Sequence, residues 1–164
     1  LMKSFLKAIT LLDKLRRKEL KNSQVFDIKK LAKYYALSDL LAAQHGNMFW
    51  GNTRFYYNPI TSKLEPISFD GYPGRKLEAP ILTGTDGICT GTYQTPFLED
   101  NDFLAEYIKQ LNIVSQEKYL NNLFSELESE LQENLRIIYK SYPQFRFSKA
   151  NFYYNQKVIK SIYF

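Results

Sequence analysis

The chain has 164 residues, which is enough for one domain of ordinary size. Its composition is 45% hydrophobic, 16% aromatic and 24% charged, which is typical of a globular protein and excludes a disordered chain. The formal net charge is +5, and the Lys residues are spread along the chain. We therefore predict no nucleic-acid partner, and we expect the densest basic run, residues 14–21, to be a solvated helix face.

Two residue counts exclude several kinds of site. Cys89 is the single cysteine, so no internal disulfide and no thiolate metal cage can form. His45 is the single histidine, which excludes a cluster of histidine ligands. No apolar run reaches the roughly 18 residues that span a membrane. Because the chain opens inside a helical pattern without a start signal, we expect residues 1–164 to be a single region of an N-terminally truncated fragment, whose targeting information is missing.

Two helices are predicted in the first 46 residues. The first covers residues 2–20, with Phe5, Ile9, Leu12 and Leu15 on one face. The second begins at Asp27, a good N-cap, and runs to a stop at Gly46. Its spacing predicts a wide apolar stripe: Leu31, Tyr34, Tyr35, Ser38, Leu41 and Ala42.

A β-hairpin is predicted next, over residues 54–69. Aromatic strand formers occupy residues 55–57, and residues 58–62 read Asn-Pro-Ile-Thr-Ser, which is turn chemistry. The return strand delivers Asp70 and Gly71 at its end. Residues 71–96 hold five of the seven Gly and three of the six Pro. An irregular stretch of this length is usually functional or mobile.

The last third is predicted to be helical, which makes the fold class α+β and mostly α. One helix starts at Asp100 or Asn101. A long helix, capped by Ser115, runs to Tyr142 and ends at Pro143. A further helix is predicted over residues 149–163. The first of these helices is expected to turn these residues inward: Phe103, Leu104, Tyr107, Ile108 and Leu111.

The segment HGNMFWGN, residues 45–52, followed by Phe69-Asp70-Gly71, is similar to a protein-kinase pattern. Kinases carry a catalytic loop H-R-D-x-x-x-x-N and then a metal-binding D-F-G. Asn52 stands where that pattern has its Asn, and Asp70 stands where it has a metal-binding Asp. The position of the catalytic Asp is occupied by Asn47.

Residues 25–71 resemble the spore coat protein H (CotH) family of atypical protein kinases. The resemblance is carried by the HGN loop, the hairpin sequence NTRFYYNPITSKLEPI and the FDG triplet, and it extends more weakly over residues 20–164. It implies a protein-kinase-like C-lobe with a β-hairpin framing the site, and Mg-ATP as cofactor. It also implies a Ser/Thr-rich protein substrate, a spore-coat or cell-surface location, and an upstream N-lobe that covers the nucleotide and carries the ATP-contacting Lys.

The chemistry of the matched residues agrees with these roles. Asp70 is a hard anionic ligand on a Gly-flanked turn, which suits Mg²⁺, and Gly71 permits a sharp turn beside it. Asn52 offers a neutral oxygen for a second metal position. The structural alternatives are that Asp70 caps a turn and that Asn52 ties down its own loop.

Asn47 leaves three alternatives open. An amide can orient a hydroxyl group but cannot take its proton. The site is then a pseudokinase that binds nucleotide without transfer, or the base is His45 or Asp39, or the loop register differs by one residue. A histidine side chain can act as a base near neutral pH, but His45 could also simply bond the last carbonyl groups of its helix.

The remaining candidates have mainly structural interpretations. Phe49 and Trp50 are expected in the core, and Glu65 is expected to pair with a Lys. Residues 83–92 resemble a phosphate-binding loop but lack its Lys and its helix, so residues 72–96 are interpreted as an activation-segment equivalent. The predicted function is transfer of the ATP γ-phosphoryl group to Ser or Thr. The alternatives are a pseudokinase, a structural component of a spore or surface layer, and transfer of AMP.

Overall fold

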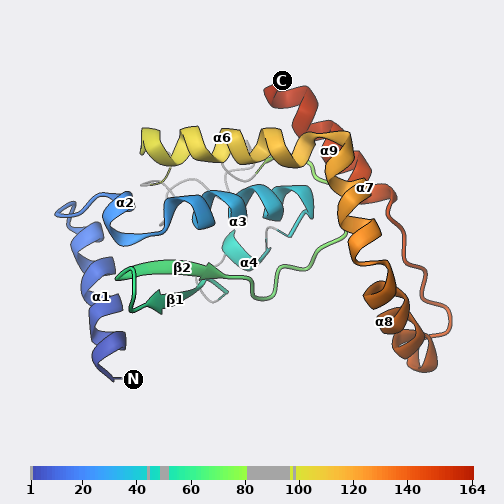
Figure 1. Ribbon diagram of the computed structural model, residues 1–164, viewed down its shortest axis with the longest axis horizontal. Helices are drawn as coiled ribbons and strands as arrows, with labels where there is room; N and C mark the ends of the chain where they lie inside the picture. Colours follow the sequence, from blue (N-terminus) through green and yellow to red (C-terminus); the bar gives the residue numbers. More distant parts are fainter. Residues whose placement is uncertain (1, 44, 49–51, 81–96, 98) are drawn as a thin grey trace.

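The computed structural model describes residues 2–43, 45–48, 52–80, 97 and 99–164, with only the backbone described at residues 47 and 48. The fold is α+β and mostly helical, as predicted (Figure 1). Its elements are α1 (Met2–Arg16), α2 (Asn22–Val25), α3 (Ile28–Leu40), α4 (His45–Met48), β1 (Arg54–Asn58), β2 (Lys63–Ile67), α6 (Asn101–Ser115), α7 (Glu117–Glu126), α8 (Glu128–Ser141) and α9 (Ala150–Tyr163).

The core lies between α3 and α6, which pack side by side, with α9 against both and the hairpin on the other side of α3 (Figure 1). Aromatic rings fill much of this space. The ring of Phe103 lies 5.4 Å from Phe97 and 5.8 Å from Tyr35, measured between centroids. Such contacts add to the large apolar area that each ring buries. The predicted stripe on α3 is buried or half-buried throughout.

Helix α3 begins where the sequence predicts and ends earlier. The Asp27 carboxylate accepts a hydrogen bond from the Lys30 backbone N–H at 3.1 Å, which is the predicted N-cap. The predicted stop at Gly46 is wrong. The helix ends at Leu40, and Ala42 adopts a positive φ of 48° that no α-helix can contain.

The predicted hairpin is confirmed. Strands β1 and β2 are antiparallel, with Arg54 opposite Ile67 and Asn58 opposite Lys63. The Asn58 side-chain oxygen accepts a hydrogen bond from the Ile60 N–H at 2.9 Å, which stabilises the turn. Because the two chain ends of a hairpin leave it side by side, this register brings the residues before Arg54 close to those after Ile67.

The predicted long helix after Ser115 is wrong. Ser115 is the last residue of α6, and its side chain bonds the Asn112 carbonyl group instead of capping a new helix. Helices α7 and α8 then follow, separated at Leu127, where ψ is 3°. Helix α8 ends before Pro143, as predicted, and extends away from the body of the molecule (Figure 1).

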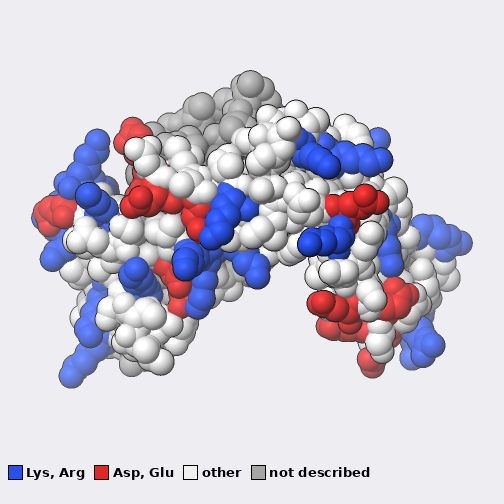
Figure 2. All heavy atoms as spheres, turned by 45° about the horizontal axis from the view of Figure 1, so that its top comes forward, with Lys and Arg blue, Asp and Glu red and all other residues white. Residues whose placement is uncertain are grey.

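Two of the predicted inner faces are not buried as expected. On α1, Phe5, Ile9 and Leu12 are exposed, and the face that packs on the core is Ala8, Leu11 and Leu15. On α6, Ile108 is exposed, although Phe103, Tyr107 and Leu111 are buried. No helix among the described residues is long and apolar enough to cross a membrane. In Figure 2, Lys and Arg side chains are interspersed with Asp and Glu on the face shown.

Candidate functional site

Three side chains that the sequence singles out meet at the open end of the hairpin. Asn52 lies two residues before β1, and Asp70 lies three residues after β2. Asn52 Nδ2 is 3.2 Å from Asp70 Oδ2 and 2.9 Å from Nδ1 of His45, the first residue of α4. His45 Nδ1 is in turn 3.0 Å from the Asp70 carbonyl oxygen. The hairpin register therefore joins the two ends of the kinase-like pattern.

The backbone around this cluster is packed as closely as glycine permits. A Cβ atom placed on Gly46 would lie 2.4 Å from the Phe69 carbonyl oxygen, which is too close for any larger residue without movement. A Cβ atom on Gly71 would lie 3.0 Å from the Ala43 Cβ. Gly46 and Gly71 are thus needed because the backbone at the start of α4 passes directly against the segment that follows β2.

Asp70 itself has a positive φ of 47°, which is uncommon for a residue with a side chain. Such backbone strain is often found at functional positions. The side chain of Asp70 is 52% exposed and that of His45 is 41% exposed. The carboxylate is therefore held by its neighbours and still open to solvent, where an ion or substrate could reach it.

Among the hydrogen bonds that join Asn52, His45 and Asp70 to one another, the acceptors outnumber the hydrogens that the donors carry. Asn52 Nδ2 lies within 3.3 Å of the His45 carbonyl oxygen, His45 Nδ1 and Asp70 Oδ2, but an amide nitrogen has two hydrogens. His45 Nδ1 can either accept from Asn52 or donate to the Asp70 carbonyl, not both. A carboxylate, an amide and two backbone carbonyls that crowd together are the ligands that Mg²⁺ takes, so these residues fit a divalent cation.

This donor set is incomplete without further oxygens. Within the part of the chain that is described, no three His, Cys, Asp or Glu side chains are grouped so that they could hold a metal. Mg²⁺ commonly uses only one or two protein carboxylates and completes its shell with water and substrate phosphates.

Several predicted residues lie partly or wholly outside the description. The backbone of Asn47 belongs to α4, but its side chain is not described. Phe49, Trp50 and the residues 83–92 are also outside the described residues. Residues 71–80 contain no helix or strand, in agreement with an irregular segment after Asp70.

Asp39 is not suited to act as the base. It lies on α3, is fully buried, and accepts a hydrogen bond from the Tyr107 hydroxyl group. Burial, and then the charge of Asp39, raise the pKa of Tyr107 well above its ordinary value. Asp39 therefore links α3 to α6 inside the core and cannot reach a protein substrate.

Glu65 pairs with a lysine, as predicted. Its carboxylate lies 2.7 Å from Lys30 Nζ and accepts a second hydrogen bond from the Asn58 side chain at 2.7 Å. The hydrogen bond from Lys30, followed by that from Asn58, lowers the pKa of Glu65. The same ion pair raises the pKa of Lys30. Through Lys30 and Asn58, Glu65 thus ties the hairpin to α3.

Sequence inspection missed two amide side chains on α9. Asn155 is fully buried and bonds three backbone groups near the site, and Asn151 bonds a fourth. The sequence does contain a sign of them. Asn155 and Gln156 stand at helical spacing between Phe152 and Ile159, on the apolar face of the predicted helix. A polar residue on a buried helix face must find hydrogen-bond partners, and amides satisfy backbone groups well.

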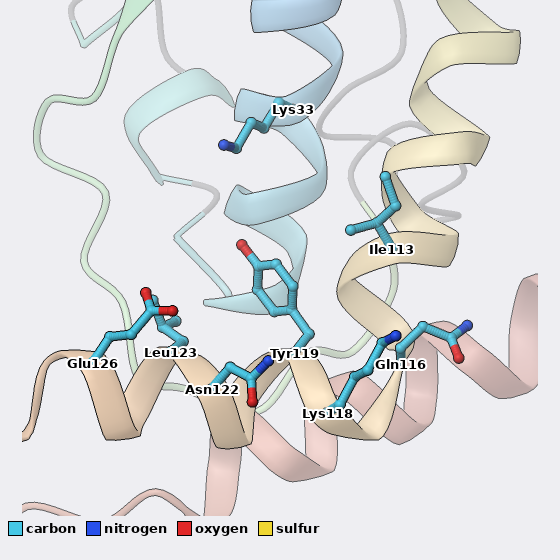
Figure 3. Close-up of a pocket in the computed structure, with 8 residues that line it drawn as sticks. All are labelled: Lys33, Ile113, Gln116, Lys118, Tyr119, Asn122, Leu123 and Glu126. Atoms are coloured by element: carbon cyan, nitrogen blue, oxygen red, sulfur yellow. The ribbon is translucent and has the colours of Figure 1, made fainter.

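A separate open pocket of about 650 Å³ lies between α3, the end of α6, and α7 (Figure 3). Tyr119 points its hydroxyl group toward Lys33 across this pocket (Figure 3). Burial, followed by the charge of Glu126, raises the pKa of Tyr119. The pocket is lined by none of the three residues that meet at the hairpin, so it is distinct from the candidate site.

The candidate site therefore rests on its own geometry: Asn52, Asp70 and His45 in contact, glycine-dependent packing of their loops, and a surplus of oxygen acceptors. The chain matches no protein-family model, no curated protein and no solved structure.

Proposed function

We propose that this chain is the metal-binding and acceptor-positioning part of a CotH-like atypical protein kinase that phosphorylates Ser or Thr of a partner protein. The observation that supports this most directly is the 3.2 Å approach of Asn52 and Asp70, which are 18 residues apart. These are the two residues that the kinase pattern assigns to metal. The proposal assigns the C-lobe to this chain, and the N-lobe with its ATP-contacting Lys to upstream sequence.

Asp70 and Asn52 would hold Mg²⁺ in this proposal. The Asp70 carboxylate is exposed, and rotation of the Asn52 amide would turn its oxygen toward the same point. When bound with ATP, Mg²⁺ would neutralise the negative charge of the phosphates. The close packing of Gly46 on the Phe69 carbonyl brings α4 against the segment that carries Asp70, which would help to position that ligand.

The reaction needs a bond between the acceptor hydroxyl oxygen and the γ-phosphorus. The bond from that phosphorus to the β,γ-bridging oxygen breaks, ADP leaves, and the hydroxyl proton must be taken up. Asn47 can hold the hydroxyl group by a hydrogen bond but cannot accept this proton. His45 is the candidate base, because its imidazole lies beside both proposed metal ligands, with Nδ1 2.9 Å from Asn52 Nδ2 and 3.0 Å from the Asp70 carbonyl oxygen.

A pseudokinase is the second candidate, and the amide at Asn47 favours it. General-base catalysis typically contributes about 10²–10⁴ in rate, and a site without that base could retain metal and nucleotide binding alone. Such a protein would serve as a binding or structural component of a spore or cell-surface layer. Transfer of AMP is a further alternative. It is distinguished by whether the α-phosphate or the γ-phosphate of ATP becomes attached to the acceptor protein.

The test uses the protein that includes this chain and its upstream lobe, incubated with Mg²⁺, γ-labelled ATP and a Ser/Thr-rich protein acceptor. The variants are Asp70→Ala, Asn47→Asp and, as a matched control, Glu65→Gln, which alters a carboxylate of the hairpin outside the site. We expect wild type and Glu65→Gln to label the acceptor and Asp70→Ala to lose labelling. A parallel reaction with α-labelled ATP detects AMP transfer.

Each other outcome decides between the candidates. Labelling only in Asn47→Asp identifies a pseudokinase that one carboxylate restores. Label retained from α-labelled ATP identifies AMP transfer. If neither the folded wild type nor Asn47→Asp transfers label, and neither binds Mg-ATP, the kinase proposal is wrong.

A further inference from the structure

The side chain of Asn155 occupies a junction between the two backbone segments that lead to the candidate site. Its Nδ2 donates to the Leu40 carbonyl at 3.0 Å and to the Arg75 carbonyl at 2.9 Å, and its Oδ1 accepts from the Leu77 N–H at 2.7 Å. Leu40 is the last residue of α3. The residue is fully buried, so these bonds are shielded from water.

The two bonded segments are placed symmetrically about the site. Leu40 lies five residues before His45, and Arg75 lies five residues after Asp70. Asn155 therefore joins the backbone that leads into His45 to the backbone that leaves Asp70. His45 Nδ1 lies 3.0 Å from the Asp70 carbonyl oxygen. The two backbone segments are therefore joined twice, by Asn155 at one end and by the contact of His45 with Asp70 at the other.

Two neighbouring contacts reinforce this junction. Asn151, one turn earlier on α9, donates to the Gly74 carbonyl at 2.8 Å. The Gly74 N–H donates to the Leu41 carbonyl at 2.9 Å. The residues between Asp70 and Leu77 have no helix or strand of their own, so these bonds replace the regular pairing that would otherwise hold the segment.

The chemistry of the junction requires an amide. Two carbonyl groups need two N–H donors and one backbone N–H needs an acceptor, and an Asn side chain supplies this combination. Asp would provide only acceptors, and Leu would provide neither. Because the groups are buried, removing the side chain would leave three backbone groups without this partner.

We propose that Asn155, assisted by Asn151, is a positioning residue: from α9 it sets the backbone on both sides of the site and thereby holds Asp70 against His45 and Asn52. The hydrogen bonds of the Asn155 side chain go to the backbone of Leu40, Arg75 and Leu77, so it acts through the backbone. Its effect on metal binding rests on the function proposed above, whereas its effect on the geometry of the cluster does not.

Gln156 provides a matched control on the same helix. It is also buried, and its amide donates to the Val114 and Gln116 carbonyls at 2.8 and 2.9 Å, at the junction of α6 and α7. Gln156→Leu therefore removes buried amide bonds from α9 without touching residues 71–77. A change seen in Asn155→Leu but not in Gln156→Leu is therefore due to the bonds to Leu40, Arg75 and Leu77, and not to the general loss of a buried amide.

The experiment uses the chain described here, with NMR signals of Gly46, Asp70 and Gly71 as reporters of the cluster. Asn155→Leu is expected to shift these signals and to accelerate hydrogen exchange at Leu77 by about tenfold, the factor expected from loss of one buried hydrogen bond. Gln156→Leu is expected to leave both unchanged and to alter residues 114–117 instead. If Asn155→Leu does not fold, Asn151→Ala, which removes one bond to Gly74, tests the same segment.

Unshifted cluster signals in a folded Asn155→Leu or Asn151→Ala would overturn the inference, as would equal shifts in Gln156→Leu. Titration with Mn²⁺ then tests the functional consequence separately. We expect Asn155→Leu to weaken Mn²⁺ binding about tenfold, and Gln156→Leu by less than about twofold. Shifted signals with no Mn²⁺ binding in wild type would sustain the positioning role and count against the metal site alone.

Discussion

Asn52 and Asp70 leave opposite strands of one hairpin, and their side chains lie 3.2 Å apart. This contact depends on the pairing of Arg54 with Ile67, which brings the two chain ends together. We predict that Asn52→Asp places two carboxylates in contact and lowers the free energy of unfolding without metal by up to about 1 kcal/mol, because Asp70 is exposed and solvent screens the repulsion, although Asn52 is half-buried. Mg²⁺ should then raise the melting temperature of Asn52→Asp more than that of wild type. Calorimetry with and without Mg²⁺ measures both effects, and an Mg²⁺ shift no larger than in wild type would contradict the site.

Gly46 is predicted to be intolerant of any side chain. Its Cβ would lie 2.4 Å from the Phe69 carbonyl oxygen, so Gly46→Ala must push the FDG segment away. We expect a loss of about 1–3 kcal/mol in the free energy of unfolding. Gly74→Ala is the control, because its Cβ would meet nothing closer than 3.9 Å and the cost arises from its φ of 94° alone. Both variants should be less stable in urea denaturation. Gly46→Ala should also shift the NMR signals of His45, and unshifted signals would contradict the close packing of Gly46 on Phe69.

The ion pair of Lys30 and Glu65 predicts that the free energy of unfolding depends on pH in both the acidic and the alkaline range. The pKa of Glu65 is lowered, so its contribution to stability is present above the usual pKa near 4.5 and is lost as pH falls through the lowered value. The pKa of Lys30 is raised, so its contribution is present below 10.5 and is lost as pH rises through the raised value.

NMR titration of Glu65 tests this assignment. Lys30→Met should raise the Glu65 pKa toward its usual value, and Asn58→Ala should raise it by less, because the hydrogen bond from Lys30 is the larger cause. A titration of Glu65 that is the same in wild type and Lys30→Met would show that the pair does not persist in solution.

Tyr107 is predicted to be essential for the contact between α3 and α6. Tyr107→Phe removes a hydroxyl donor from the buried Asp39 carboxylate and should lower the free energy of unfolding by about 1–3 kcal/mol. Tyr139→Phe, at an exposed position of α8, is the control and should change it by less than about 0.5 kcal/mol. Equal effects of the two variants in urea denaturation would contradict the buried hydrogen bond.

The raised pKa of Tyr107 adds an alkaline test. The folded state keeps this hydroxyl protonated while the unfolded state releases its proton above pH 10, so the stabilising contribution is lost progressively above that pH. Wild type should therefore lose stability more steeply above pH 10 than Tyr107→Phe. Parallel alkaline curves for the two proteins would contradict the assignment.

Two positions on α6 test the location of the core. Leu111 is fully buried, whereas Ile113 is 44% exposed. Leu111→Ala should cost about 2–5 kcal/mol through lost burial and a residual cavity. Ile113→Ala should cost less than about 1 kcal/mol, because much of its side chain already contacts water. Chemical denaturation of both variants checks the difference, and a reversed order would mean that α6 presents another face to α3.

The features that the sequence predicted correctly depend on residues close together in the chain. The Asp27 cap bonds a residue three positions away, and the Asn58 turn bonds a residue two positions away. The hairpin follows from the turn and the aromatic strands beside it. Because the two chain ends of the hairpin lie side by side, Asn52 and Asp70 come into contact at its open end.

Helix ends and exposed faces required the tertiary structure. The α3 helix ends at Leu40 because residues 41–43 turn to meet the segment after Asp70, and Gly46 serves the approach to Phe69 instead of ending a helix. The end of α7 at Leu127 and the exposure of Phe5 on α1 likewise depend on which other elements pack against these helices.

By itself, the sequence determined the caps at Asp27 and Asp100 and the hairpin, because short-range hydrogen bonds and side-chain alternation specify them. Only the tertiary structure decided that Asn155 binds Leu40 and Arg75, which are separated from it by 115 and 80 residues. The physical reason is that a buried amide takes whichever backbone groups the packing of distant elements leaves without partners.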